Sequence, residues 1–198
     1  MGLNRQTSVY ISPLALLTLS ACGGEKGNSI ANVVTNTVTG NVVKGPLSNA
    51  LVFLDLNSNG IMDGSETSVR TDSDGRFSIS TTATDYKIVA LTDDSTVDSS
   101  SGSVISGITL SAPKSAGVIT PTTTLMEESG LSAAEVAEVL DLPDGVDPLN
   151  FNPFAQGVDA SVALKVEKVS QQIMTAVTSF ASATEGAGAS VKGAFEAA

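Results

Sequence analysis

The sequence contains no histidine and no tryptophan, and its single cysteine is Cys22. Catalytic triads that pair serine or cysteine with histidine therefore cannot form in their usual way, and neither can histidine-ligated zinc or haem sites. The chain also lacks a glycine-rich phosphate-binding loop. We therefore predict that the protein is not an enzyme.

Basic residues are scarce as well: ten Lys and Arg stand against 21 Asp and Glu, a formal net charge of −11 at pH 7. Phosphate binding needs clustered Lys and Arg, so nucleic acid is not an expected partner. The same imbalance disfavours adsorption to anionic lipid headgroups. The carboxylates suit divalent cations, although a solvated acidic surface accounts for most of them.

The N-terminus has one short apolar run, residues 9–21, after a start that carries Arg5 and no acid. Thirteen helical residues span about 20 Å, which is too short for a hydrocarbon core of about 30 Å. A basic start, a short apolar run and small residues before a cut site describe a secretory signal peptide. We predict that residues 1–21 are a signal peptide; a buried helix is the alternative.

This run ends in Leu19-Ser20-Ala21-Cys22. The four residues resemble the lipobox of bacterial lipoproteins, which implies a diacylglyceryl thioether on Cys22, cleavage before it and an acylated amine. Lipidation also explains an odd cysteine in an exported protein, and two or more acyl chains anchor stably. Gly23 at the next position resembles lipoproteins sorted to the outer membrane of a Gram-negative cell. We expect an exported, membrane-anchored protein at the outer membrane or cell surface, held by a flexible tether over 22–37.

Residues 38–111 show short alternating patterns of apolar and polar residues, separated by turn residues. Phe77 and Ile79, for example, alternate with polar neighbours. The expected strands are 38–44, 50–56, 67–71, 76–81, 86–92 and 104–110. Six strands at a spacing of roughly ten residues predict a small antiparallel β-sandwich.

The pattern changes after residue 111. Residues 112–130 contain Pro113 and Pro121 and predict a connector. A helical region is expected over 131–184, and 185–198 is expected to be a flexible tail. The predicted fold class is therefore a mainly β N-terminal domain followed by an α-helical C-terminal region.

Two helices are expected in that region. Ser132 and Glu135 have the spacing of a capping box, which predicts a helix at 132–141 with Val136, Val139 and Leu140 on one face. Steps of three and four residues separate the apolar side chains of a second helix, expected at 157–184. This stripe packs on a neighbouring element or binds another chain, and it comprises Val162, Val166, Val169, Ile173, Val177 and Phe180.

Residues 55–66 read DLNSNGIMDGSE, with oxygen-bearing side chains at alternate positions before a glycine. The segment resembles the calcium loop of EF-hand proteins. Calcium takes six to eight oxygen ligands at about 2.3–2.6 Å. The resemblance implies a Ca²⁺ site whose ligands are Asp55, Asn57, Asn59, the carbonyl of Ile61, Asp63 and a bidentate Glu66.

The residues around this loop differ from those of EF-hand proteins, because a strand and not a helix is expected before it. Only the ion site is therefore carried over, and a hairpin loop that binds nothing is the alternative.

Over 39–92 the sequence also resembles carboxypeptidase-regulatory-like (prealbumin-like) β-sandwich modules, and it is similar to the B-type repeats of Gram-positive surface adhesins. Gly45-Pro46-Leu47, the acidic loop and residues 71–77 carry this resemblance. It implies a rigid spacer or binding platform.

Other acidic residues are weaker candidates. Asp72 and Asp74 are expected in a turn, with a role in completing the ion's shell as the alternative. A second site at Asp93, Asp94 and Asp98 competes with a solvated loop tip.

These features predict a non-enzymatic, calcium-binding, lipid-anchored cell-surface protein that acts as a structural or adhesion module. Its expected partners are the membrane, calcium and a surface protein or glycan. The alternative is the anchoring or accessory portion of a larger surface enzyme that acts on glycans or peptides. A solute-binding lipoprotein is disfavoured, because the chain has only six Phe, two Tyr and no Trp as aromatic platforms.

Overall fold

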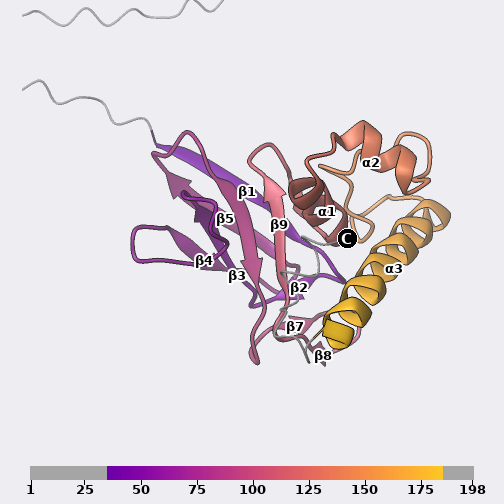
Figure 1. Ribbon diagram of the computed structural model, residues 1–198, viewed down its shortest axis with the longest axis horizontal. Helices are drawn as coiled ribbons and strands as arrows, with labels where there is room; N and C mark the ends of the chain where they lie inside the picture. Colours follow the sequence, from indigo (N-terminus) through magenta and orange to yellow (C-terminus); the bar gives the residue numbers. More distant parts are fainter. Residues whose placement is uncertain (1–34, 185–198) are drawn as a thin grey trace, which may run out of the picture. The chain divides into compact units, whose positions relative to one another are not determined.

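The computed structural model describes residues 35–184, with side chains to residue 179. The predicted signal peptide, the lipidation site Cys22 and the predicted tail 185–198 lie outside the described residues. A strand-rich region is followed by three helices, so the predicted fold class is confirmed (Figure 1). The strands are β1 (Asn36–Val42), β2 (Leu47–Ser48), β3 (Leu51–Asp55), β4 (Ser68–Arg70), β5 (Arg76–Thr81), β6 (Lys87–Leu91), β7 (Val97–Asp98), β8 (Ser103–Val104), β9 (Thr109–Pro113) and β10 (Val118–Ile119), and the helices are α1 (Pro121–Ser129), α2 (Ala133–Val139) and α3 (Ala160–Thr184).

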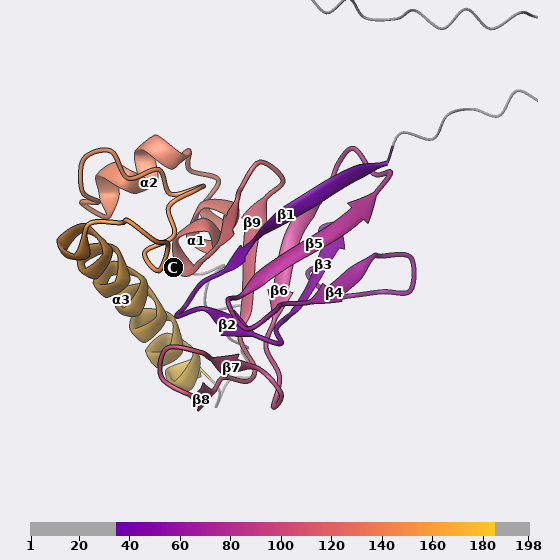
Figure 2. The ribbon, with the colours of Figure 1, turned by 180° about the vertical axis from the view of Figure 1, so that it is seen from behind.

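The described strands form three small sheets, ordered β4-β3-β6-β9, β10-β1-β5 and β2-β7-β8. All of the pairings are antiparallel except that of β1 with β10. The first two sheets share one apolar core, and both views of the ribbon show them as neighbouring layers (Figures 1 and 2). The two sheets contribute to this core the side chains of Val42, Val52, Leu54, Phe77, Ile79, Ile88 and Leu110, among others.

Period-two alternation produces β5 at the predicted bounds. Phe77 and Ile79 are buried, whereas the polar residues between them are exposed. The strand expected at 104–110 is wrong, because this stretch is divided between β8 and β9. Gly107 lies between them at φ +75°, a left-handed conformation that interrupts a strand and that glycine adopts without strain.

Helix α1 lies where the sequence predicted a connector at 112–130, so that expectation is wrong. Pro121 begins the helix, at a position where its missing N–H is not needed. The hydroxyl of Thr123 donates to the carbonyl of Ser111 (2.9 Å), and the N–H of Ser111 donates to Thr124 Oγ1 (2.9 Å). Because Ser111 belongs to the edge strand β9, the start of α1 satisfies polar groups that an open edge would expose.

Helix α2 begins with the predicted capping box. The Glu135 N–H donates to Ser132 Oγ, and the Ser132 N–H donates to Glu135 Oε2 (2.8 Å). Val136 is fully buried, but Val139 is 70% exposed, so the predicted apolar face is wrong at Val139. The helix ends at this residue, and Asp141 at φ +48° turns the chain away.

Helix α3 packs on the rest of the chain through the predicted stripe. Val166, Ile173 and Val177 are buried, and the last two belong to the same core as the strands. The stripe therefore packs on neighbouring elements of the same chain, which was the first of the two predicted alternatives. The side chain of Phe180 lies outside the side chains that the structure describes. Among residues 35–184, no helix is long and apolar enough to cross a membrane.

Candidate calcium site

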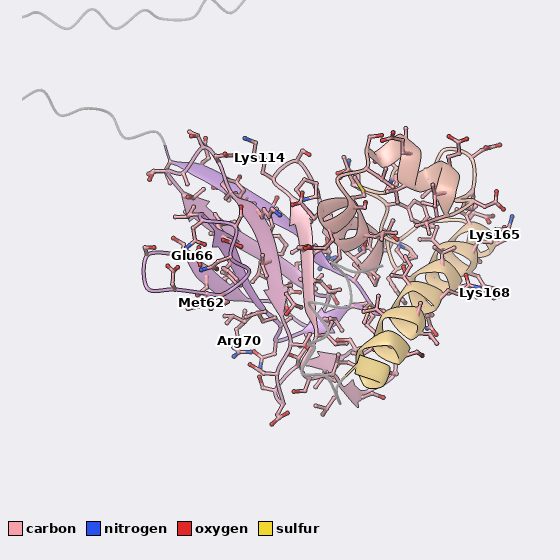
Figure 3. All side chains as sticks on the ribbon, in the orientation of Figure 1. Met62, Glu66, Arg70, Lys114, Lys165 and Lys168 are labelled. Carbon is pink, nitrogen blue, oxygen red and sulfur yellow. The ribbon has the colours of Figure 1, made fainter. Side chains whose placement is uncertain are left out.

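The loop 55–66 connects β3 to β4. Asp55 is the last residue of β3, where it stands opposite Lys87 of β6. Strands thus precede and follow the loop, as expected from the apolar residues before it. Figure 3 shows Met62 and Glu66 on this loop, at the side of the strand-rich region away from the helices.

The loop wraps around the carboxylate of Asp55, which is only 1% exposed. Its Oδ2 accepts a hydrogen bond from the N–H of Gly60 (2.7 Å), and its Oδ1 accepts from the N–H groups of Asn57 (3.2 Å) and Asn59 (3.3 Å). Gly60 makes the bend at φ +68°. The first carboxylate of the motif is therefore fixed before any ion binds.

Glu66 closes the loop. It is 8% exposed, its Oε1 accepts from the N–H of Leu56 (2.9 Å), and its Oε2 accepts from the N–H of Asp63 (3.1 Å). The Glu66 carboxylate thus joins the start of the loop, at Leu56, to its end, at Asp63. Hydrogen bonds from these two N–H groups fix the orientation of both of its oxygens.

The two amide side chains repeat the contact made by Asp55. Asn57 Oδ1 accepts from the N–H of Asn59 (3.1 Å), and Asn59 Oδ1 accepts from the N–H of Ile61 (2.7 Å). Each is an Asx turn, in which a side-chain oxygen accepts from the backbone two residues later. These successive turns coil residues 55–61 and explain why Asp and Asn alternate in the sequence.

Asp63 lies at the outer part of the loop. It accepts hydrogen bonds from Ser65 Oγ (2.8 Å) and from Asn57 Nδ2 (3.0 Å). The Ser65 hydroxyl is the main cause that lowers the pKa of Asp63, which is therefore a carboxylate at neutral pH. Ser65 is not among the predicted site residues, although a serine two residues after an aspartate is a common hydrogen-bond partner of that aspartate.

No cationic side chain compensates these acids in the described part of the chain. Its ion pairs leave out Asp55, Asp63 and Glu66. Lys87, opposite Asp55 in the sheet, pairs instead with Glu127, at 3.1 Å between Nζ and Oε2. Burying carboxylates without positive charge is costly; in this loop the backbone N–H groups that donate to Asp55 and Glu66 offset part of that cost.

This donor set fits calcium. The three carboxylates, the two amide oxygens and the carbonyl of Ile61 are hard oxygen ligands from one loop, which Ca²⁺ prefers and Zn²⁺ does not. Within residues 35–184, no three acidic, Cys or His side chains already form a metal-holding group. In the structure the loop oxygens accept hydrogen bonds from the loop's own N–H groups, and an ion would compete with some of these bonds.

The other acidic candidates take part in turns and ion pairs. Asp72 accepts from the N–H groups of Asp74 and Arg76, which makes it a turn residue. Asp93 pairs with Arg70 (2.6 Å), whose guanidinium holds the pKa of Asp93 well below its usual range.

Asp98, the last residue of the predicted second site, is buried. It accepts from the N–H (2.8 Å) and the hydroxyl (2.6 Å) of Ser100, whereas Asp94 is exposed. These contacts give Asp93 and Asp98 structural roles that need no ion.

No protein-family model, no curated protein sequence and no solved structure matches this chain.

Proposed function

We propose that this chain is a non-enzymatic, calcium-binding, lipid-anchored cell-surface protein whose β-sandwich serves as a structural or adhesion module. The observation that supports the calcium site best is the pair of buried carboxylates, Asp55 and Glu66, in a loop of oxygen ligands without a cationic partner in the described chain. The lipid anchor is supported by Leu19-Ser20-Ala21-Cys22 behind a signal-like segment. A surface protein or glycan is the proposed partner of the module.

In this proposal Asp55, Asp63 and Glu66 bind the ion through carboxylates, while Asn57 and Asn59 contribute amide oxygens. The bound ion supplies the positive charge that the loop lacks. It also fixes the end of β3, an inner strand of the four-stranded sheet, to the start of β4. Calcium binding would therefore stabilise the sandwich as a rigid platform, because a ligand that binds only the folded state adds to its stability.

Calorimetric titration of the full chain with calcium tests this function. We expect one site with a dissociation constant of about 10⁻⁴ to 10⁻³ M, the range of extracellular modules. Glu66→Gln removes a bidentate carboxylate and should weaken binding by about tenfold or more. Glu138→Gln, which changes an exposed carboxylate on α2, is the matched control and should bind like the wild type. The absence of binding heat in the wild type would refute the proposal.

A further inference from the structure

The calcium loop carries three exposed apolar side chains. Leu56 is 45% exposed, Ile61 64% and Met62 40%. Ile61 and Met62 are adjacent and lie between the expected ligands Asn59 and Asp63. Scattered exposed apolar residues are normal, but three of the twelve residues of this polar loop expose an apolar side chain.

This loop lies at the end of the sandwich where the chain enters from its N-terminal side. Asn36, the first residue of β1, stands opposite Thr81, the last residue of β5. Only residues 82–86 then separate β5 from Lys87, which stands opposite Asp55 at the base of the loop. The start of β1 and the calcium loop therefore share one end of the strand-rich region, and in Figure 1 both lie on the side away from the helices.

A groove of about 340 Å³ lies beside the loop and its charge is balanced, because two lysines and the two acids Asp85 and Glu127 line it. Leu56 lines it together with Lys87 and Lys114. Lys114 Nζ contacts the Thr84 carbonyl (3.1 Å) and the carboxylate of Asp85 (3.2 Å). The Asp85 side chain is almost fully exposed, so this ion pair is weak and Lys114 remains accessible to a phosphate. Apolar side chains next to an accessible lysine, here Lys114, match the boundary between acyl chains and headgroups of a bilayer, whereas Lys87 is paired with Glu127.

We propose that, with calcium bound, this end of the sandwich docks on the phospholipid bilayer that carries the lipid on Cys22. The inference rests on the proposed function, because it requires both the ion and the anchor. Fourteen residues lead from Cys22 to Asn36, and a flexible chain of that length has a root-mean-square span of about 20 Å. With a lipid on Cys22, a span of that size would give the loop-bearing end a high effective concentration at the membrane.

Calcium makes this docking possible. Without the ion, Ile61 and Met62 stand among three carboxylates, which are strongly disfavoured next to acyl chains. A bound Ca²⁺ cancels two of the three negative charges and ties Asp63 and Glu66 to the ion. The apolar side chains then meet the bilayer with little accompanying charge, and docking should depend on calcium.

Depth-dependent fluorescence quenching tests the inference on the full-length lipidated protein. Met62→Cys gives one free thiol for an environment-sensitive dye, because the sulfur of Cys22 is held in the diacylglyceryl thioether of the proposed anchor. Ser103→Cys is the matched control. Ser103 is exposed on β8, in the small sheet with β2 and β7. β2 precedes β3 and β7 follows β6 in the chain, so this sheet is at the end of β3 and β6 opposite the calcium loop. The protein is placed in phosphatidylcholine vesicles that contain nitroxide-labelled acyl chains.

We expect calcium to increase quenching at position 62 at least twofold over EDTA, with little change at position 103. Ile61→Ser, which keeps the carbonyl ligand, should remove about half of that increase. Equal quenching at 62 in calcium and EDTA, with calcium binding intact by calorimetry, overturns the docking inference and leaves the calcium site standing. Protection of the dye without lipid quenching indicates contact with a second copy and also overturns it. No binding heat, or an unacylated Cys22 by mass spectrometry, refutes the proposed function itself and this inference with it.

Discussion

At the scale of single residues, the conformation of Gly60 shapes the calcium loop. Its φ of +68° is a left-handed conformation, and its N–H makes the shortest contact to Asp55 Oδ2, at 2.7 Å. Left-handed backbone costs an L-residue roughly 1–2 kcal/mol, because its β-carbon approaches a carbonyl oxygen. Gly64, four residues later, has no such φ, and a β-carbon there would contact nothing within 4 Å.

These two glycines make a matched pair for mutagenesis. Gly60→Ala should lower the free energy of unfolding by about 1–2 kcal/mol and weaken calcium binding, because it strains the bend that orients Asp55. Gly64→Ala should stay within about 0.5 kcal/mol of the wild type. Urea denaturation and calorimetric titration measure both effects. If the two variants behave alike, the bend at Gly60 does not organise the site.

Much of the loop could be predicted from its sequence, because Asx turns and a glycine bend are local. The alternation of Asp55, Asn57 and Asn59 is visible directly in the chain. The burial of Asp55 depends on the sheet beside it, and the contact from Glu66 to Leu56 joins residues ten positions apart. The hydroxyl of Ser65 contributes to the loop in a way that its position in the motif does not suggest.

At the scale of elements, α1 is held to β9 by buried hydroxyls. Thr123 Oγ1 accepts from the N–H of Thr120 (2.8 Å) and donates to the carbonyl of Ser111 (2.9 Å). Thr123→Val keeps the shape and removes both bonds, so it should cost about 2 kcal/mol of stability by leaving buried groups unpaired. Thr175→Val, on an exposed part of α3, is the control and should cost less than about 0.5 kcal/mol. If urea denaturation shows equal losses of stability for the two variants, the Thr123 hydroxyl does not hold α1 to β9.

Helix α3 gives the second prediction at this scale. Ile173 is buried in the shared core, so Ile173→Asp should lower the free energy of unfolding by about 3 kcal/mol or more through charge burial. Gln172→Asp adds the same charge on the exposed side of the helix and should change stability little. Thermal melts of both variants measure the difference. An unchanged melt for Ile173→Asp would mean that α3 does not pack on the strands.

The elements differ in how well their sequences predict them. β5 and the start of α2 follow from a strict alternation and from a capping box, both of which are local signals. Helix α1 was missed because two prolines suggested a connector, although Pro121 is well suited to a first helical position. Val139 fits the helical period but is exposed, because α2 ends there and the chain turns away.

At the scale of the whole molecule, the order of patterns predicts a strand-rich region followed by helices. The sequence does not reveal that α3 completes the strand core, because contacts between Ile173 and residues far earlier in the chain leave no periodic signal. The shared core means that the strands and helices stabilise each other.

The lipid anchor gives a prediction for the whole chain in the cell. Cys22→Ser should abolish membrane retention and leave uncleaved or soluble precursor, because a hydroxyl cannot form the thioether. Cell fractionation with mass spectrometry of the N-terminus measures both outcomes. A serine variant that stays in the membrane fraction and is fully processed would rule out the lipoprotein assignment.

The melting temperature of the full chain in EDTA and in calcium tests the central claim most directly. Binding to the folded state alone adds about 1.4 kcal/mol at a calcium concentration tenfold above the dissociation constant. For a unit of this size, that corresponds to an increase of about 3–6 °C. Magnesium should raise the melting temperature much less, since it requires a tighter octahedral shell and retains its waters. The decisive comparison uses calcium at ten times the dissociation constant, about 10 mM for the weakest site expected. If the melting temperature there is the same as in EDTA, the result contradicts a calcium site at residues 55–66.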